Sequence, residues 1–299
     1  MKILVTGAEG MVGSALCPEL RRRGHTVVPT DRLPTSVETQ GLDICDGDAI
    51  HQMMQRVVPT LVIHLAAETD VDRCEQEPAH AYRVNAVGTE LVVRACQTLG
   101  VRLLYMSTAG VFDGQKPTPY VETDAPNPVN VYGRTKLAGE VAVHQLGVPY
   151  QIVRASWMVG GCERDKKFVG KILRLLDERQ ELSVVTDKVG SLTFTEDLSR
   201  GIGELIATEH VGLFHMANQG TCSRYDVACK VVEYVGRRDV TIRPVPSSAF
   251  PLPAPRAASE VLQNARLQQV GLDTMPRWEE SLRTYVHRYL QMVKCASSS

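Results

Sequence analysis

The chain has 299 residues, with 33 Lys or Arg against 34 Asp or Glu, and its formal net charge is −1. This balance leaves no basic field of the kind that attracts nucleic acid or an anionic membrane surface. No apolar stretch reaches transmembrane length, and the apolar run at residues 3–5 is too short for a signal peptide. The eight cysteines are scattered, without a CxxC pair or a zinc-like His spacing. We therefore expect reduced thiols in a cytoplasm, no disulfide framework and no metal site.

The first half of the chain alternates short apolar strands with amphipathic helices. Helices are predicted at residues 12–23 and 79–99, each followed by a glycine, and the strands at 3–5, 26–31, 61–65, 103–106 and 150–153. Continuous apolar strands separated by helices indicate a parallel sheet covered on both faces. The fold class predicted is α/β, with a doubly wound parallel sheet of the Rossmann type.

After residue 156 this alternation loosens. Helices are predicted at 166–179, 195–207, 223–235 and 276–293, and strands at 182–186 and 212–216. The segment 244–256 carries five prolines and is expected to be irregular, and the chain ends in serines. We expect residues 1–156, completed by about 182–218, to form the Rossmann domain. Residues 157–181 and 219–299 then form a smaller, mostly C-terminal α/β region that binds the substrate.

A glycine-rich motif, GxxGxxG, follows the first strand and opens the first helix. Glycine is needed where the turn is tight and the backbone approaches a pyrophosphate, and the helix N-terminus offers free N–H groups to the phosphates. With an acid at the end of the second strand, the context predicts a dinucleotide site. Its first residues are Gly7, Gly10, Met11, Val12 and Gly13.

The choice between NAD and NADP depends on the pair Asp31-Arg32. Asp31 is placed to bond the adenosine ribose hydroxyls, whereas Arg32 suits a 2′-phosphate, so NADH and NADPH both stay open. Asp43-Ile44 and Ala66-Ala67 follow later strands, where loops reach the adenine and the nicotinamide ribose. Small residues at 66 and 67 let the backbone run close to the cofactor, although close packing alone also explains them.

The candidate catalytic residues are Tyr132, Lys136 and a hydroxyl of the pair Ser107-Thr108. Tyr132 and Lys136 are four residues apart and share one helix face. We expect the ammonium to lower the pKa of the phenol, so that Tyr132 exchanges a proton with a substrate oxygen, and Lys136 to hold the nicotinamide ribose. YxxxK is common by chance, but here it follows a strand that ends in hydroxyls able to bond the same oxygen.

These motifs together resemble the extended short-chain dehydrogenases/reductases, and within them the dTDP-4-dehydrorhamnose reductases. The resemblance covers nearly the whole chain, and its most specific stretch is VFDGQKPTPYVETDAPNPVNVYGRTKLAGE. The other segments that carry it are TGAEGMVGS, HLAA, YMSTAGVFDG, RASW, VTDKVGSLTFTEDL, GLFHMANQG and PAPR.

The resemblance implies reduction of the C4 ketone of a nucleotide-linked 4-keto-6-deoxy sugar, dTDP-4-dehydro-L-rhamnose giving dTDP-L-rhamnose. It makes Tyr132 the proton donor, Lys136 its partner, and Thr108 the group that polarises the C4 carbonyl. Trp157 is then expected to line the sugar pocket, with a core aromatic as the alternative. Arg256 is expected to face the nucleotide diphosphate, with a surface arginine as the alternative.

One departure from the family pattern concerns the residues after Ser107-Thr108. The family commonly has Asp-Tyr there, whereas this chain has Ala109-Gly110. The change is expected to remove two sugar contacts while leaving proton transfer through Tyr132 intact. It puts the identity of the sugar and the stereochemistry of the product in question.

Two other functions fit the same scaffold. A nucleotide-sugar epimerase or dehydratase returns the hydride to the sugar and consumes no cofactor, although Ala109 removes the obvious acid of a dehydratase. A non-catalytic subunit, resembling the regulatory subunit of methionine adenosyltransferase, is disfavoured by the presence of Tyr132, Lys136 and Thr108. A homodimer is expected only from the general frequency of such assemblies.

Overall fold

The computed structural model describes residues 1–145, 147–161, 165 and 167–297. The predicted helix start at residue 166, the last two serines and Cys162 lie outside these residues, as does the side chain of Cys295. Free thiols are found at Cys17, Cys45, Cys74, Cys96, Cys222 and Cys229. In the described part of the chain, no helix is long and apolar enough to cross a membrane.

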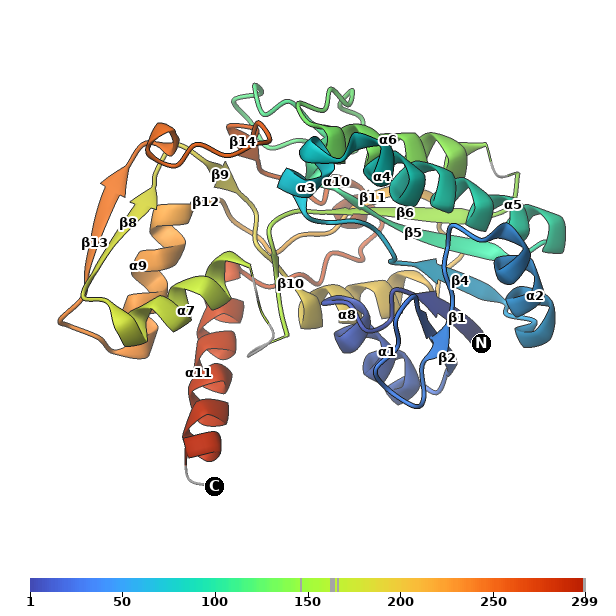
Figure 1. Ribbon diagram of the computed structural model, residues 1–299, viewed down its shortest axis with the longest axis horizontal. Coiled ribbons are helices and arrows are strands. Elements are labelled where there is room, and N and C mark those ends of the chain that lie inside the picture. The colour runs from blue at the N-terminus through green and yellow to red at the C-terminus, as the bar shows by residue number, and fades with distance from the viewer. Residues whose placement is uncertain (146, 162–164, 166, 298–299) are drawn as a thin grey trace.

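Seven parallel strands form the central sheet, in the order β11-β6-β5-β4-β1-β2-β3 (Figure 1). The order reverses between β1 and β4, and crevices for ligands form at the carboxyl ends of strands beside such a reversal. This topology is the predicted Rossmann sheet. Its strands are β1 (Lys2–Thr6), β2 (Thr26–Asp31), β3 (Gln40–Gly41), β4 (Leu61–His64), β5 (Arg102–Thr108), β6 (Tyr150–Ala155) and β11 (Gly212–His215).

Helices cover both faces of this sheet because successive residues of each buried strand point to opposite sides. Ile3 and Val5 pack with α1 (Gly13–Arg22) and α8 (Thr195–Leu205). Leu4 packs on the opposite face, whose covering helices are α2 (Gly47–Val57), α5 (Thr89–Leu99) and α6 (Val131–His144). Two separate apolar layers therefore enclose the sheet.

The helix predicted at 79–99 is not a single α-helix. The chain forms α3 (Val71–Gln76) and α4 (Pro78–Tyr82), then a π-helical turn, η1 (Arg83–Gly88), that runs into α5. The π-helical turn carries Asn85, whose side chain forms hydrogen bonds with Glu68 and Thr135 in two other segments. Such turns within α-helices are often found at functional sites.

The smaller lobe has its own apolar core, formed by side chains of α7 (Phe168–Glu178), α9 (Arg224–Val235) and α11 (Trp278–Ser297) together with short strands. Helix α11 extends beyond the predicted end of the last helix. The remaining elements are η2 (Ala109–Val111), β7 (Met158–Val159), α7 (Phe168–Glu178), β8 (Glu181–Val185), β9 (Val189–Gly190), β10 (Thr193–Phe194), β12 (Cys222–Ser223), α9 (Arg224–Val235), β13 (Thr241–Val245), η4 (Ser247–Ala249), β14 (Ser259–Glu260), α10 (Ala265–Gln269) and α11 (Trp278–Ser297).

Two details of this lobe differ from the sequence expectations. The strand predicted at 182–186 pairs with β13 in a two-stranded sheet, so it does not complete the Rossmann sheet as a strand near 182 was expected to do. Pro244 lies in β13, within the segment expected to be irregular. A two-stranded sheet consists of edges only, and an edge strand tolerates a proline because it leaves one side of the backbone unpaired.

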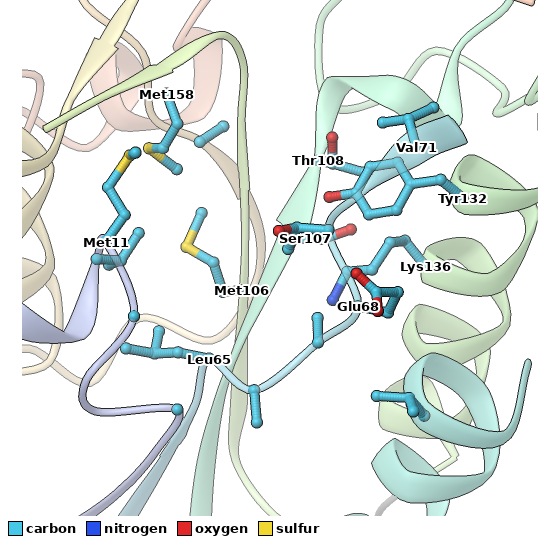
Figure 2. A pocket seen from close by; sticks show the side chains of 18 of the residues that line it. Met11, Leu65, Glu68, Val71, Met106, Ser107, Thr108, Tyr132, Lys136 and Met158 are labelled. Atoms are coloured by element: carbon cyan, nitrogen blue, oxygen red, sulfur yellow. The ribbon is translucent and has the colours of Figure 1, made fainter. Parts of the chain in front are cut away.

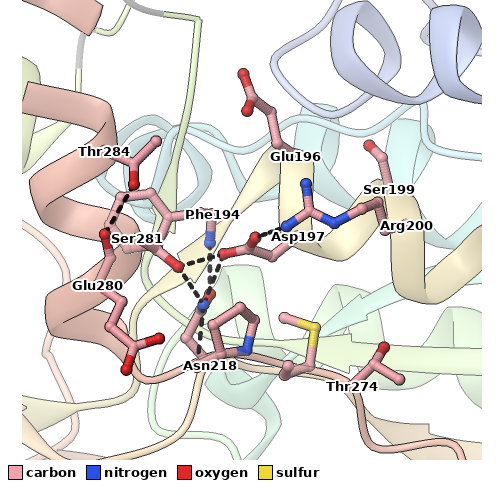
Figure 3. Close-up of polar contacts among 12 residues, drawn as sticks. Phe194, Glu196, Asp197, Ser199, Arg200, Asn218, Thr274, Glu280, Ser281 and Thr284 are labelled. Atoms are coloured by element: carbon pink, nitrogen blue, oxygen red, sulfur yellow. Dashed lines mark hydrogen bonds and ion pairs between the residues drawn. The ribbon is translucent and has the colours of Figure 1, made fainter. Parts of the chain in front are cut away.

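A buried polar junction joins the Rossmann layer to the smaller lobe (Figure 3). The carboxylate of Asp197, on α8, accepts hydrogen bonds from Asn218 Nδ2 at 2.7 Å and from Ser281 Oγ, on α11, at 2.6 Å. Asn218 Oδ1 in turn accepts the backbone N–H of Phe194 at 2.9 Å. Since Asp197 and Asn218 are both buried, this junction fixes the two lobes against each other.

Candidate active site

A cavity of about 670 Å³ lies where the carboxyl ends of the central strands meet the smaller lobe. All of the site residues predicted from the sequence line it, although they come from eight separated segments. They are Gly7, Gly10, Met11, Val12, Gly13, Asp31, Arg32, Asp43, Ile44, Ala66, Ala67, Thr108, Tyr132, Lys136, Trp157 and Arg256.

The glycine-rich loop leaves no room for side chains at two of its positions. Gly7 has a φ of +68°, and a Cβ there would come within 2.7 Å of the backbone nitrogen of Ala66. A Cβ on Gly13 would come within 2.4 Å of the carbonyl oxygen of Ala8. Helix α1 starts at Gly13 and has no acidic residue in its first turn. Its N–H groups therefore offer an unopposed anion site, which fits the pyrophosphate of a dinucleotide.

The acid at the end of β2 is held by the same loop. Asp31 Oδ2 accepts the backbone N–H of Glu9 at 3.2 Å. The carboxylate of Glu9 accepts hydrogen bonds from Thr35 and Ser36, and these hydrogen bonds lower its pKa to about 2. The exposed Arg32 also lines the cavity. Asp31 and Arg32 thus both line the cavity at the end of β2, next to the glycine-rich loop.

Tyr132 and Lys136 reach the cavity from the first two turns of α6. Asn130 caps this helix by accepting the backbone N–H of Gly133 at 2.9 Å. Figure 2 shows both side chains pointing into the cavity, with Ser107 and Thr108 facing them from the end of β5. A Cβ on Gly133 would come within 2.1 Å of the carbonyl oxygen of Gly110, so glycine is required for α6 to pack this closely on the turn after β5.

The pKa of Tyr132 moves opposite to the sequence expectation. Burial raises it to about 12, and a hydrogen bond to Thr108 only partly offsets this effect. The expected lowering by the Lys136 ammonium is not found, because burial also lowers the pKa of Lys136, to about 7. At neutral pH the phenol is therefore protonated, which is the state that a proton donor to a ketone oxygen needs.

Beneath Lys136 lies a buried network that the sequence did not reveal. The carboxylate of Glu140 accepts two hydrogen bonds from the guanidinium of Arg154, at 2.8 and 2.6 Å, and one from the hydroxyl of Ser107. Arg154 and Glu140 are each about 2% exposed. The network fixes the end of β5, which carries Thr108, against α6, which carries Tyr132. A glutamate one turn after the lysine of YxxxK was its only sequence signal.

Asn85 and His64 fix the loop that follows β4. Asn85 Nδ2 donates to the carbonyl oxygen of Glu68 and to Thr135 Oγ1, both at 3.0 Å, and its Oδ1 accepts the N–H of Glu68 at 2.8 Å. His64 makes hydrogen bonds with Thr6 and with a threonine of α5, and burial lowers its pKa to about 3. The loop carrying Ala66 and Ala67 is thereby held between β1 and α6 by neutral groups.

The smaller lobe provides the far wall of the cavity, with several residues that were not predicted. Trp157 Nε1 donates to Glu260 at 2.6 Å, and the guanidinium of Arg224 lies 3.6 Å from the centre of the Trp157 ring. Arg256 forms an ion pair with Asp72 at 3.0 Å. Lys167 and Phe168 also line this wall. Glu260, Arg224, Lys167 and Phe168 belong to no motif identified in the sequence, so only the fold reveals that they are neighbours of Trp157.

The two positions that depart from the family pattern do not line the cavity. Ala109 is fully buried in an apolar cluster with Phe112 and Tyr120. A Cβ on Gly110 would be 3.6 Å from the Tyr132 ring. A larger side chain at 110 is therefore a neighbour of Tyr132, whereas position 109 belongs to the core. The expectation that the change removes two sugar contacts stays a prediction; the structure adds that the turn directs position 109 inward.

Over the described residues, no three His, Cys, Asp or Glu side chains gather in a way that could hold a metal ion.

A Rossmann sheet with a glycine-rich loop, a strand-end threonine and a Tyr/Lys pair on one helix defines the short-chain dehydrogenase/reductase class. Within it, the chain belongs to the family described as RmlD substrate binding domain, whose model matches residues 1–291. It is 37% identical over 287 residues to a dTDP-4-dehydrorhamnose reductase of Mycolicibacterium smegmatis, covering 95% of this chain and 85% of that protein.

Solved structures agree with this assignment. The dTDP-4-dehydrorhamnose reductase of Bacillus anthracis, determined in complex with NADP, superimposes with a TM-score of 0.90 at 37% identity. The match covers 96% of this chain and 100% of that one. A UDP-glucose 4-epimerase of Thermotoga maritima reaches a TM-score of 0.85 at 22% identity; at that identity, the likeness concerns the fold alone.

Proposed function

We propose that this protein is an NAD(P)H-dependent reductase that converts the C4 ketone of dTDP-4-dehydro-L-rhamnose to the hydroxyl of dTDP-L-rhamnose. The observation that carries the proposal is the position of Thr108, Tyr132 and Lys136 in the cavity that also contains the glycine-rich loop. Family membership and the similarity to reductases of this name support the substrate.

The residues that line the Rossmann side of the cavity fit a dinucleotide. Two features suit a pyrophosphate: the tight loop, which only glycine permits at positions 7 and 13, and the N-terminus of α1, which has no acidic residue in its first turn. Gly10, Met11, Val12, Asp31 or Arg32, Asp43, Ile44, Ala66 and Ala67 are the other proposed cofactor contacts. NADPH or NADH, when bound, supplies the hydride that adds to C4.

Two side chains of the protein, Thr108 and Tyr132, are proposed to act on the oxygen of the ketone. Thr108 donates a hydrogen bond to it, which polarises the carbonyl. Tyr132, protonated because its pKa is about 12, transfers its phenolic proton to the oxygen as negative charge develops there. The phenolate then recovers a proton from solvent, with Lys136 stabilising it and holding the ribose of the cofactor.

The two lobes divide the binding tasks in this proposal. The Rossmann layer, residues 1–156 with α8 and β11, binds the cofactor, and the segments 157–181 and 219–299 bind the nucleotide sugar. Trp157 is proposed to contact the sugar, and Arg256 to face the diphosphate. We also propose a homodimer working in the cytoplasm, with no metal, nucleic acid or membrane as a partner.

Cofactor stoichiometry tests the reaction class. A reductase consumes one reduced nicotinamide for each sugar hydroxyl formed, which absorbance and NMR of the product measure together. An epimerase or dehydratase would change the sugar without net consumption of the cofactor, and a non-catalytic subunit would leave the sugar unchanged. Either result would reject the proposed function.

A further inference from the structure

One cation on the wall formed by the smaller lobe has no role in the proposed mechanism. Arg224 is the first residue of α9, after the capping Ser223. Its guanidinium carbon lies 3.6 Å from the centre of the Trp157 ring and 4.9 Å from that of Phe168. All three side chains line the cavity. Two aromatic rings thus hold a planar cation at the edge of the space left for the substrate.

Arg224 lacks the partners that Arg154 and Arg256 have. Among the described residues, its guanidinium makes no hydrogen bond and no ion pair, whereas Arg154 is bonded twice to Glu140 and Arg256 is paired with Asp72. Glu260, whose charge acts on Arg224, accepts the indole N–H of Trp157 and makes no hydrogen bond with the guanidinium. Burial lowers the pKa of Arg224 to about 10, so the group stays charged at neutral pH although it has lost hydration.

The charge of Glu260 acts on Arg224 without an ion pair or a hydrogen bond. The N–H donors of this partly desolvated guanidinium are therefore unfilled until a ligand supplies an anion in direct contact. Its planar fork of N–H donors matches phosphate oxygens, and stacking on aromatic rings limits its rotation. The pyrophosphate of the cofactor is accounted for at α1, which belongs to the Rossmann layer rather than to the lobe that carries α9. The anion that remains for Arg224 is the diphosphate of the nucleotide sugar.

We propose that Arg224, held by Trp157 and Phe168, is a principal ligand of the substrate diphosphate and binds it more strongly than the ion-paired Arg256 does. This inference rests on the proposed nucleotide-sugar function. It also gives Glu260 a positioning task, since the hydrogen bond to Trp157 Nε1 holds the ring on which Arg224 is stacked.

Calorimetric binding of dTDP, of thymidine and of NADPH to wild type and Arg224→Gln tests the inference without requiring turnover. We expect dTDP affinity to fall about 10- to 100-fold, as for loss of hydrogen bonds to a charged group. Affinities for thymidine and for NADPH should stay within about twofold, and Arg224→Lys should recover part of the dTDP affinity because it restores the charge without the planar fork. Arg256→Gln should weaken dTDP binding less than Arg224→Gln.

Arg283→Gln is the matched control, because Arg283 also lies over an aromatic ring, at 5.0 Å from the centre of Tyr234, but does not line the cavity. It should bind dTDP like wild type. Unchanged dTDP affinity in Arg224→Gln would overturn the inference, and so would equal losses for dTDP, thymidine and NADPH. Tight, Arg224-dependent binding of dTDP by a wild-type protein that reduces no sugar would reject the proposed reaction and leave the diphosphate site standing.

Discussion

The ammonium of Lys136 lies 4.1 Å from the centre of the Tyr105 ring, on the floor of the cavity. Lys136 is only 3% exposed, and burial lowers its pKa to about 7, with Glu140 acting in the opposite direction. A face-on aromatic ring offers a cation partial compensation for lost water. The lysine proposed to bind the cofactor ribose is therefore buried at a cost to the stability of the folded protein.

Lys136→Met should therefore impair both turnover and cofactor affinity. The methionine keeps the apolar stem but cannot bond the ribose hydroxyls or stabilise the phenolate. We expect kcat to fall by at least about tenfold and NADPH to bind at least about tenfold more weakly. Fluorescence titration of NADPH and steady-state kinetics measure the two effects. A variant with wild-type NADPH affinity would remove Lys136 from the cofactor site.

The same substitution should change how stability depends on pH. The pKa of Lys136 is about 7 in the folded protein, whereas the ordinary value is 10.5. Between these values the unfolded chain binds more protons, so the free energy of unfolding contributed by this group rises with pH. The free-energy cost of burying the charged lysine is fully present below about pH 7, and Lys136→Met removes this cost. The gain in Tm over wild type should be larger at about pH 6 than at about pH 9; a pH-independent difference would contradict the shifted pKa.

Tyr132→Phe should remove the transferable proton and little else. We expect kcat to fall by about 100-fold or more, in the range attributed to general acid catalysis, with NADPH affinity nearly unchanged. Stopped-flow measurement of a single turnover isolates the chemical step. Retention of most of the activity would mean that another group protonates the ketone oxygen.

Glu140→Gln should destabilise the protein strongly, because it leaves Arg154 buried with a neutral partner. Breaking a buried ion pair from one side costs about 3–5 kcal/mol. Glu90→Gln is the matched control, since Glu90 pairs with Arg94 on the exposed surface of a helix, where such pairs contribute about 0.3–0.5 kcal/mol. Urea unfolding of both variants gives the comparison. If both variants lost a similarly small free energy of unfolding, the Glu140 network would contribute little to holding β5 against α6.

The Rossmann sheet and the cofactor side of the cavity could be predicted from the sequence, because local patterns encode them. Alternating apolar strands, the GxxGxxG loop and the YxxxK helix each occupy one short stretch of chain, and the parallel topology brings their carboxyl ends to one edge. The resulting prediction placed the loop residues, Tyr132 and Lys136 in one cavity, as the structure does.

The rest of the site depends on long-range packing that no local pattern carries. Arg224 and Glu260 meet Trp157 only because β14, α9 and β7 belong to the same lobe. The direction of the pKa shift of Tyr132 was predicted wrongly for a related reason. The spacing along the helix shows that Lys136 is a neighbour of the phenol, but it does not show that the phenol is buried, and burial raises its pKa. The burial of Ala109 could not be predicted either, because the turn after β5 determines where this residue points.

Absorbance of the reduced nicotinamide, followed after mixing the wild-type protein with enzymatically prepared dTDP-4-dehydro-L-rhamnose, tests the central claim most directly. NADPH and NADH are used in separate reactions, with Tyr132→Phe as the control. Rapid oxidation of at least one cofactor by wild type, and not by the variant, is the predicted result, and the faster cofactor shows whether Arg32 or Asp31 governs the choice. No oxidation of either cofactor, while both still bind, would contradict the account and direct attention to a different nucleotide sugar.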